Sequence, residues 1–364
     1  MPDLIEQIHQ SPKKFVLALT GGGSKALAEL LSIPGASKTI LEVSIPYHSQ
    51  ALITYLGQVP ENSASSSTAR NLAMAAWRRA RKINESSINV AGVGVTCALT
   101  TKRRRRGANR CHIAIQTSTQ TSEVNVFFDK AIYSRQNEEN IISDLIIQQL
   151  AEFCGLRAPQ HHIAGRILKR TKNAPETWSD LLSGKLKTTL SPTDPINIFP
   201  GAFNPLHEGH KKMIAYSEQL LGGKVYLEIS ISNVDKMAID FLTMQDRQEQ
   251  INSNSLIFTN APTFLEKARL FPKACFILGA DTLLRIVDKK YYDNNEKLLA
   301  SSIDELCELG CKMVVFGRDL DGEFVTLDDL KLPEKFKRLC VGVEEKEFRS
   351  DISSTLLRET RKAY

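Results

Sequence analysis

The 364-residue sequence contains no long apolar run, no internal repeat and no low-complexity tract. No stretch approaches the roughly 20 apolar residues that a membrane-spanning helix needs, and the N-terminal segment MPDLIEQIHQSPKK lacks the apolar core of a signal peptide. Its seven cysteines form no CxxC pair, and an odd number fits neither a disulfide framework nor a zinc site. We therefore expect a cytoplasmic protein with reduced thiols, no membrane contact and no protein-held metal.

The net charge of +6 depends largely on one short basic run, Lys102 to Arg106. Outside this run the chain is close to neutral, so its composition does not predict a nucleic-acid partner. The run itself is typical of a solvated loop. A nuclear-localisation signal or a phosphate-binding patch remains an alternative, which leaves the nucleus open as a second location.

The length exceeds that of most single hydrophobic cores, so we expect two domains. In residues 1–156, β-branched runs alternate with amphipathic stretches, a pattern typical of an α/β layer domain. Residues 157–194 are basic, carry several prolines and show no long periodic segment, which predicts a linker that packs in part through Trp178. A second α/β pattern, with a parallel sheet, is expected over 195–364.

The segment IFPGAFNPLHEGH, from Ile198 to His210, carries the strongest chemical signal. Gly201 follows a predicted strand, and His207 and His210 lie three residues apart at a predicted helix start, on one face of the helix. A helix N-terminus favours an anion, and imidazoles there can donate to phosphate oxygens as negative charge builds up. Gly209 keeps bulk away from a ligand between the histidines. The alternative is a histidine pair that caps an ordinary helix.

A second segment, ISSTLLR, ends at Arg358. Ser353, Ser354 and Thr355 are good N-cap residues whose hydroxyl and N–H groups could hold the β- and γ-phosphates of a nucleotide. Arg358 follows one turn later and could pair with the same phosphates. A plain capped helix would explain this segment equally well.

Together, GAFNPLHEGH and ISSTLLR resemble the HxGH and ISSTxxR motifs of the nucleotidylyltransferase superfamily. The wider motif is similar to nicotinamide and nicotinate mononucleotide adenylyltransferases, with pantetheine-phosphate adenylyltransferases and cytidylyltransferases as more distant relatives. The resemblance extends from Ile196 to Arg358 and implies a Rossmann-like domain. It also implies roles for individual residues: catalysis by His207, His210 and Arg358; nucleotide binding by Gly201, Phe203, Asn204, Gly279, Asp281, Ser353, Ser354 and Thr355; and acceptor binding by Lys236 and Arg318.

This resemblance implies direct in-line transfer with ATP and a mononucleotide as substrates. The mononucleotide phosphate attacks the α-phosphorus of ATP, pyrophosphate leaves, and the two histidines, Arg358 and a Mg²⁺ bound with ATP spread the charge. Two alternatives stay open. One is transfer to another phosphorylated acceptor, such as pantetheine phosphate, or cytidylyl transfer; the other is a protein that binds or senses nucleotides without turnover.

Residues 16–128 resemble the CinA C-terminal family, whose active members deamidate nicotinamide mononucleotide. The resemblance rests on LTGGGSKALAELL from Leu19, on Tyr47 to Ser49 and on GVGVTCALTTKRRRRG from Gly92. Ala18 stands where the family has its required serine, and Leu52 where it has a lysine, which implies a catalytically degenerate domain. Thr20, Gly21 and Gly22 would remain as a phosphate-binding turn, or simply as a tight strand-to-helix turn. Both families commonly self-associate, so a homo-oligomer is also open.

Overall fold

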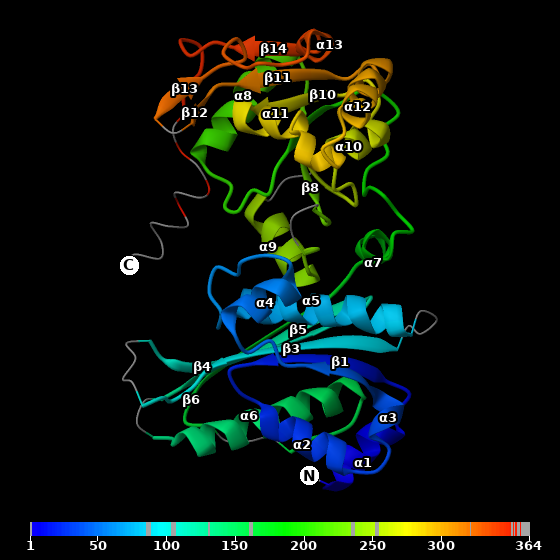
Figure 1. The fold of residues 1–364 in the computed structure, drawn as a ribbon, viewed down its shortest axis with the longest axis vertical. Coiled ribbons are helices and arrows are strands. Elements are labelled where there is room, and N and C mark those ends of the chain that lie inside the picture. The colour runs from blue at the N-terminus through cyan, green and yellow to red at the C-terminus, as the bar shows by residue number, and fades with distance from the viewer. Residues whose placement is uncertain are drawn as a thin grey trace. The chain divides into compact units, whose positions relative to one another are not determined.

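A computed structural model describes residues 2–84, 89–102, 107–129, 132–159, 163–233, 237–251, 255–320, 322–350, 352, 354 and 357. The chain divides into two compact units, shown as a ribbon in Figure 1. Unit 1 comprises Met1–Ser179 together with Asp235–Met244, and unit 2 comprises Asp180–Val234 together with Gln245–Tyr364.

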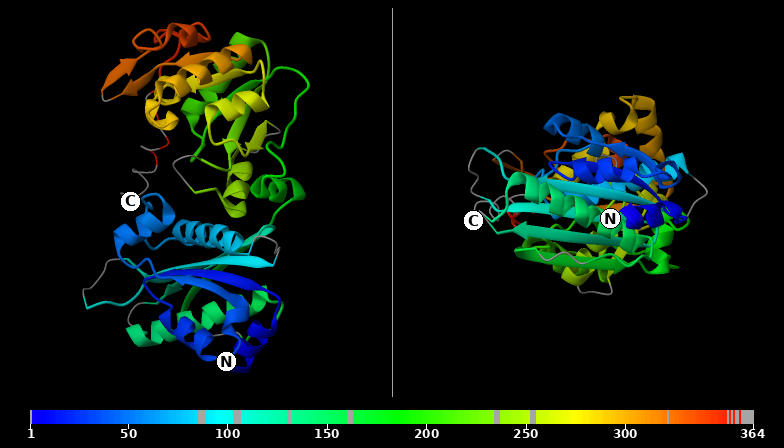
Figure 2. Two further views of the ribbon diagram at one scale, coloured as in Figure 1. Left: turned by 45° about the vertical axis from the view of Figure 1, so that its right-hand side comes forward. Right: turned by 90° about the horizontal axis from the view of Figure 1, so that it is seen from below.

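Unit 1 is built on a mixed sheet with the strand order β2-β1-β3-β4-β5-β6. Strand β1 pairs in parallel with β2 and β3, and the pairs from β3 to β6 are antiparallel. The helices α4 and α5 cover one face, and α1, α2 and α6 the other (Figures 1 and 2). The bounds are β1 (Lys14–Thr20), β2 (Ile40–Ser44), β3 (Val90–Ala98), β4 (Asn109–Gln116), β5 (Gln120–Phe128), β6 (Gly165–Asn173), α1 (Pro2–Gln10), α2 (Ser24–Ser32), α3 (Ala36–Thr39), α4 (Ser49–Leu56), α5 (Ser66–Ile83) and α6 (Arg135–Phe153).

Helix α5 lies unusually close to strand β3, because glycines face it. A Cβ atom added to Gly92 would lie 2.0 Å from the backbone nitrogen of Trp77, and one added to Gly94 would lie 2.1 Å from the carbonyl oxygen of Ala69. The opposite face of the sheet carries the large apolar core, in which Phe15, Leu17, Ile113, Ile142 and Leu150 are buried. Small residues therefore bring α5 onto the sheet, whereas α6 packs through large side chains.

Part of the expected linker, residues 157–194, instead belongs to regular structure. Strand β6 pairs antiparallel with β5 along its whole length, and α7 (Glu176–Ser183) follows it. The side chains of β6 are almost all exposed, and six of its nine residues are polar or charged in GRILKRTKN. An edge strand of this kind needs no apolar alternation, because backbone hydrogen bonds to one neighbour hold it in place.

Unit 2 contains a sheet with the strand order β14-β11-β10-β7-β8-β9, and each neighbouring pair that the described residues form is parallel. The expected parallel α/β sheet is thus confirmed. The bounds are β7 (Asn197–Pro200), β8 (Val225–Ser230), β9 (Leu256–Thr259), β10 (Cys275–Gly279), β11 (Lys312–Phe316), β14 (Cys340–Val343), the separate hairpin β12 (Arg318–Leu320) and β13 (Glu323–Val325), and the helices α8 (Glu208–Leu221), α9 (Phe241–Ile251), α10 (Phe264–Leu270), α11 (Ala280–Ile286), η1 (Lys289–Tyr292), α12 (Glu296–Glu308) and α13 (Glu334–Lys337).

One segment of the expected second domain belongs to unit 1. Residues Asp235–Met244 follow β8 in the chain but are part of unit 1, whereas Gln245 and the rest of α9 are part of unit 2. The boundary between the units therefore falls within α9. No helix among the described residues is long and apolar enough to span a membrane.

Candidate active site

The strand order of unit 2 creates a site at the carboxyl ends of β7 and β10. Along the chain the sheet grows from β7 to β8 and β9 on one side, and from β10 to β11 and β14 on the other. In such parallel sheets, ligands bind at this switch point, outside the carboxyl ends of the strands. Gly201 follows β7, and Gly279 ends β10, so both glycines lie at this edge.

The loop between β7 and α8 is shaped by the packing of Phe203. This residue has a positive φ of 43°, its side chain is only 2% exposed, and the peptide bond between Asn204 and Pro205 is cis. Its ring would lie 2.8 Å from a Cβ atom on Gly201, so only glycine fits there. The ring also meets Phe199 edge to face, with centroids 5.3 Å apart, and His210 at 5.1 Å. Phe203 and Gly201 thus hold the loop that leads into the histidines.

His207 and His210 lie together at the start of α8. Their rings stack with centroids 3.7 Å apart and an interplanar angle of 25°. The backbone N–H of His207 donates to Nδ1 of His210 at 3.3 Å, so the proton of a neutral His210 ring resides on Nε2. Nδ1 of His207 is buried and has no hydrogen-bond partner among the described residues. A Cβ atom on Gly209 would lie 3.1 Å from this nitrogen, which supports the expectation that Gly209 keeps the space free.

Both imidazoles are poor bases in this environment. Burial, with contributions from His207 and Arg318, lowers the pKa of His210 from 6.5 to about 3. Burial and then the charge of Arg318 also lower the pKa of His207. Near neutral pH the pair is therefore uncharged, and it can act on a phosphate through N–H donation but not as a pair of cations.

Arg318 provides the positive charge of the site. Its Nε lies 3.7 Å from Oδ1 of Asp281 and would lie 2.8 Å from a Cβ atom on Gly279. Burial lowers the pKa of Arg318, and Asp281 opposes this effect. Its Nη2 is 3.2 Å from the sulfur of Met213 in α8. The structure thus brings three predicted residues, Gly279, Asp281 and Arg318, to the histidine helix.

The described part of the C-terminal motif also reaches this loop. The hydroxyl of Ser354 donates to the carbonyl oxygen of Pro205 at 2.9 Å, which links ISSTLLR to GAFNPLHEGH. The other predicted residues of the motif, Ser353, Thr355 and Arg358, and the predicted acceptor residue Lys236, lie outside the described residues. Among those that are described, no group of three or more His, Cys, Asp or Glu side chains could hold a metal ion.

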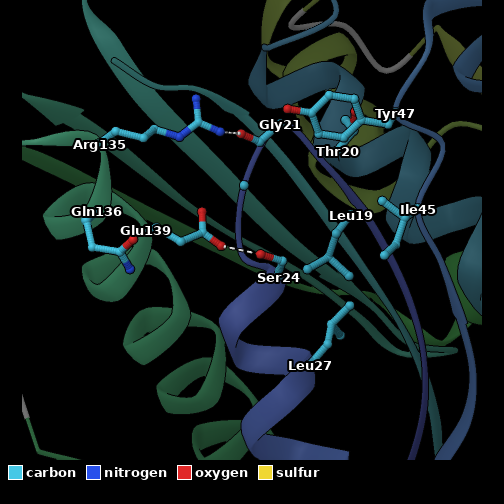
Figure 3. A pocket seen from close by; sticks show the side chains of 11 residues that line it. Leu19, Thr20, Gly21, Ser24, Leu27, Ile45, Tyr47, Arg135, Gln136 and Glu139 are labelled. Atoms are coloured by element: carbon cyan, nitrogen blue, oxygen red, sulfur yellow. Dashed lines mark hydrogen bonds between the residues drawn. The ribbon is translucent and has the colours of Figure 1, made fainter. Parts of the chain in front are cut away.

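The glycine-rich turn of unit 1 lies at a separate hollow of about 250 Å³ (Figure 3). Gly21 and Gly23 have positive φ, and a Cβ atom on Gly21 would lie 2.2 Å from the carbonyl oxygen of Cys97. Thr20, Gly21 and Gly22 line the hollow, next to Arg135 and Glu139 of α6.

Glu139 occupies the N-terminus of α2, where a phosphate was expected. Its Oε2 accepts from the N–H of Gly23 at 3.0 Å, and its Oε1 accepts from the hydroxyl of Ser24 at 2.9 Å and from the N–H of Lys25 at 3.3 Å. The helix end is therefore already capped by a carboxylate of the protein. Ala18 and Leu52, at the positions that resemble family catalytic residues, are fully or almost fully buried.

Three side chains at these sites were not predicted from the sequence. Glu139 is 116 residues from Gly23, and Ser350 reaches the helix start at Gly209 from 141 residues away. Gln250 of α9 contacts the loop before His207. None belongs to a local motif, so no pattern in the sequence marks them.

The residues of this site lie in a part of the chain that is similar to known proteins. Residues 198–360 match the family model described as cytidylyltransferase-like. Unit 2 contains a cytidylyltransferase-like domain. Over 159 residues the chain is 28% identical to a protein of Schizosaccharomyces pombe described as a putative nicotinamide mononucleotide adenylyltransferase, a match that covers 40% of this chain and 61% of that protein. The chain thus spans about three fifths of the length of this relative.

Solved structures of CinA-type proteins are similar to the N-terminal part of the chain. The competence or damage-inducible protein from Enterobacter asburiae aligns with a TM-score of 0.34 and 14% identity, covering 42% of this chain and 96% of that one. The competence/damage inducible protein CihA from Agrobacterium tumefaciens aligns with a TM-score of 0.33 and 18% identity, covering 42% and 91%.

Proposed function

We propose that this protein is an adenylyltransferase that transfers AMP from ATP to nicotinamide or nicotinate mononucleotide and releases pyrophosphate. The observation that carries the proposal is the stacked pair His207 and His210, at a helix start beside the switch point of a parallel sheet, with Arg318 next to it. The cytidylyltransferase-like domain supports nucleotidyl transfer as the class of reaction.

In this proposal the histidines bind the α-phosphate through neutral imidazoles. Nε2–H of His210 and the neutral ring of His207 stacked on it donate to phosphate oxygens as their negative charge increases. The N–H groups at the start of α8 and the charge of Arg318 stabilise the same oxygens. Arg358, Ser353 and Thr355 are proposed to contact the leaving pyrophosphate, and Lys236 the acceptor phosphate. Mg²⁺ is proposed to arrive on the triphosphate, as part of the substrate.

A pyridine mononucleotide is the proposed acceptor for two reasons. The Schizosaccharomyces pombe relative is described as acting on nicotinamide mononucleotide, and the motif GAFNPLHEGH is similar to that of pyridine mononucleotide adenylyltransferases. The main alternatives are another phosphorylated acceptor and a protein that binds nucleotides without turnover. The unpartnered nitrogen of His207 supports a ligand at this helix start, because a buried polar group without a partner is costly unless a ligand satisfies it. The turnover assay below separates the enzyme from a binding protein.

The decisive experiment measures pyrophosphate release from the full chain with MgATP and a panel of acceptors: nicotinamide mononucleotide, nicotinate mononucleotide and pantetheine phosphate. We expect turnover with one of the pyridine mononucleotides. His210→Ala should reduce it about 100-fold or more, as loss of one donor to a developing oxyanion does. The matched control is Lys211→Ala, the next residue in α8, whose exposed ion pair with Glu208 contributes little.

Two results would count against the proposal. Turnover in His210→Ala close to that of the unmodified protein would exclude the histidine mechanism. Turnover with pantetheine phosphate alone would keep the reaction class but replace the acceptor.

A further inference from the structure

Unit 1 has a second hollow, lined by charged side chains and separate from the glycine-rich turn. It measures about 600 Å³ and lies among β2, α4, α5 and the segment that contains Met237. The residues that line it all belong to unit 1 and are Glu42, Ser44, Tyr55, Ala75, Arg78, Arg79, Lys82 and Met237. We call it the α5 hollow, and its volume is in the range of small-molecule sites.

Positive charge predominates among the lining side chains. The cations are Arg78, Arg79 and Lys82 of α5, and the one carboxylate is that of Glu42 in β2. Nε of Arg79 lies 2.7 Å from Oε2 of Glu42, in an ion pair whose side chains are 54% and 29% exposed. Neither Arg78 nor Lys82 forms an ion pair with another described residue, and Nη1 of Arg78 contacts the sulfur of Met237 at 3.7 Å. The α5 hollow thus carries an excess of two positive charges.

The spacing of Arg78 and Lys82 favours an anionic ligand. They are four residues apart, so they lie on one side of α5, and like charges at this spacing destabilise a helix. An anion between them would remove this repulsion, and a phosphate could accept from the planar guanidinium through two oxygens. The alternative is that these cations only complement the negative end of the α5 dipole. That role requires no hollow beside them.

The α5 hollow also has an apolar part. Tyr55 of α4 and Ala75 of α5 line it together with Met237. Aromatic and thioether groups pack well against the organic part of a ligand. A bare phosphate ion would leave this surface uncovered, whereas the organic group of a phosphate ester would cover it.

We propose that the α5 hollow binds a phosphate monoester of a small organic molecule, with its phosphate between Arg78 and Lys82 and its organic group against Tyr55 and Met237. Such a monoester carries a charge of about −1.5 to −2 near pH 7, which matches the excess positive charge of the hollow. The carboxylate of Glu42 limits the affinity, because it repels the phosphate. The proposal is independent of the reaction proposed for unit 2, because all of these residues lie in unit 1.

The methionine methyl signals in the nuclear magnetic resonance spectrum of the labelled full chain test the proposal at the hollow itself. Phenyl phosphate is the probe, and inorganic phosphate and phenol are the comparison ligands. The methyl signal of Met237, assigned with Met237→Leu, should shift and saturate with phenyl phosphate, and should require higher concentrations of either comparison ligand. The signal of Met213, which contacts Arg318 in unit 2, reports separately any binding near the histidines. Met74, fully buried in α5, is the internal reference.

Substitutions in the hollow should change the affinity in opposite directions. Arg78→Ala removes a charged donor and should raise the Kd for phenyl phosphate about tenfold. Glu42→Gln removes the repelling carboxylate and should lower this Kd about threefold, a gain that damage to the fold would not produce. Arg81→Ala is the matched control, because it removes a positive charge from the same helix. Arg81 lies over the ring of Trp77 and does not line the hollow, so the Kd should be unchanged.

Four results would overturn the proposal. Without a saturable shift of the Met237 signal, the cations would have the helix dipole as their only role. A shift of the Met213 signal alone would mean that unit 2 binds the phosphate and the α5 hollow does not. An equal loss of affinity in Arg81→Ala and Arg78→Ala would indicate non-specific attraction to the charge of α5. Equal Kd values for inorganic phosphate and phenyl phosphate would exclude a site for the organic group.

Discussion

At the scale of single residues, the groups around His207 and His210 keep both imidazole rings neutral. Phe199 and Phe203 meet the ring of His210 edge to face, and Arg318 adds a positive charge nearby. Burial and this charge both disfavour protonation, so the histidines stay neutral in the pH range where phosphates carry their negative charge. Neutral N–H donors can then strengthen their hydrogen bonds as charge builds up on the phosphate, without first losing a proton.

The lowered pKa of His210 predicts a pH dependence of stability. Above pH 6.5 the ring is neutral in both folded and unfolded chains. Between pH 6.5 and about 3, the His210 ring is protonated in the unfolded chain but stays neutral in the folded chain. The free energy of unfolding therefore falls as the pH falls through this window. In His210→Gln, we expect the free energy of unfolding of unit 2, measured by calorimetry, to fall less steeply as the pH is lowered from 6.5 to about 3.

The comparison needs a substitution that changes no titrating group. Gln219→Ala, at an exposed position in α8, should leave the decline unchanged. If the free energy of unfolding depends on pH in the same way in the unmodified protein and in His210→Gln, the buried His210 ring is not the cause of the decline.

At the scale of elements, the sequence was informative where a motif is local and uninformative where contacts are distant. The strand, glycine and helix start around Gly201 and His207 are contiguous in the chain, and the structure confirms their arrangement at a parallel sheet. Strand β6 was missed, because an exposed charged edge strand lacks apolar alternation. Glu139 at the start of α2 was missed, because nothing within α2 shows which distant side chain caps it.

The close contact between α5 and β3 gives a prediction for unit 1. Gly92→Ala would place a methyl group 2.0 Å from the backbone nitrogen of Trp77 and force the helix away from the strand. Overpacking of this kind costs about 1–3 kcal/mol and occasionally more. Urea unfolding followed by tryptophan fluorescence should show the loss, since Trp77 and Trp178 both lie in unit 1.

Gly107→Ala is the matched control for this change. A Cβ atom there meets only the end of the Arg110 side chain, at 3.4 Å, so stability should be unaffected. Equal urea midpoints for Gly92→Ala and the unmodified protein would mean that α5 can move away from β3 without loss of stability.

At the scale of the whole molecule, each unit has a large apolar core of its own among the described residues, and the boundary between the units lies within α9. The composition and the two α/β patterns predicted two domains, but not that Asp235–Met244 would join unit 1. That arrangement depends on the pairing of Arg70 with Asp240, which are 170 residues apart, and on the burial of Phe241. Single-sequence patterns report periodicity over one or two turns and contain no information on such pairings.

The separate cores predict two unfolding transitions with different responses to ligand. MgATP binds unit 2 in the proposed function, so a concentration 100 times its Kd should add about 2.7 kcal/mol to the stability of that unit. The calorimetric transition of unit 2 should rise more than the fluorescence transition, which reports the tryptophans of unit 1. A single transition with the same shift in both signals would show that the units unfold together.

The carboxylate of Glu139 has a consequence for any anion that approaches the glycine-rich turn. Such an anion would compete with the carboxylate of Glu139. Because α6 holds this carboxylate beside the turn, its effective concentration there does not depend on the concentration of the protein. Admission would require Glu139 to swing outward, which would break its hydrogen bonds to Gly23 and Ser24 but leave those from α2 to Asn140 and Ser143 of α6 in place. An anion bound at this turn would therefore weaken the contact between α2 and α6, and an anion that binds weakly would not displace Glu139.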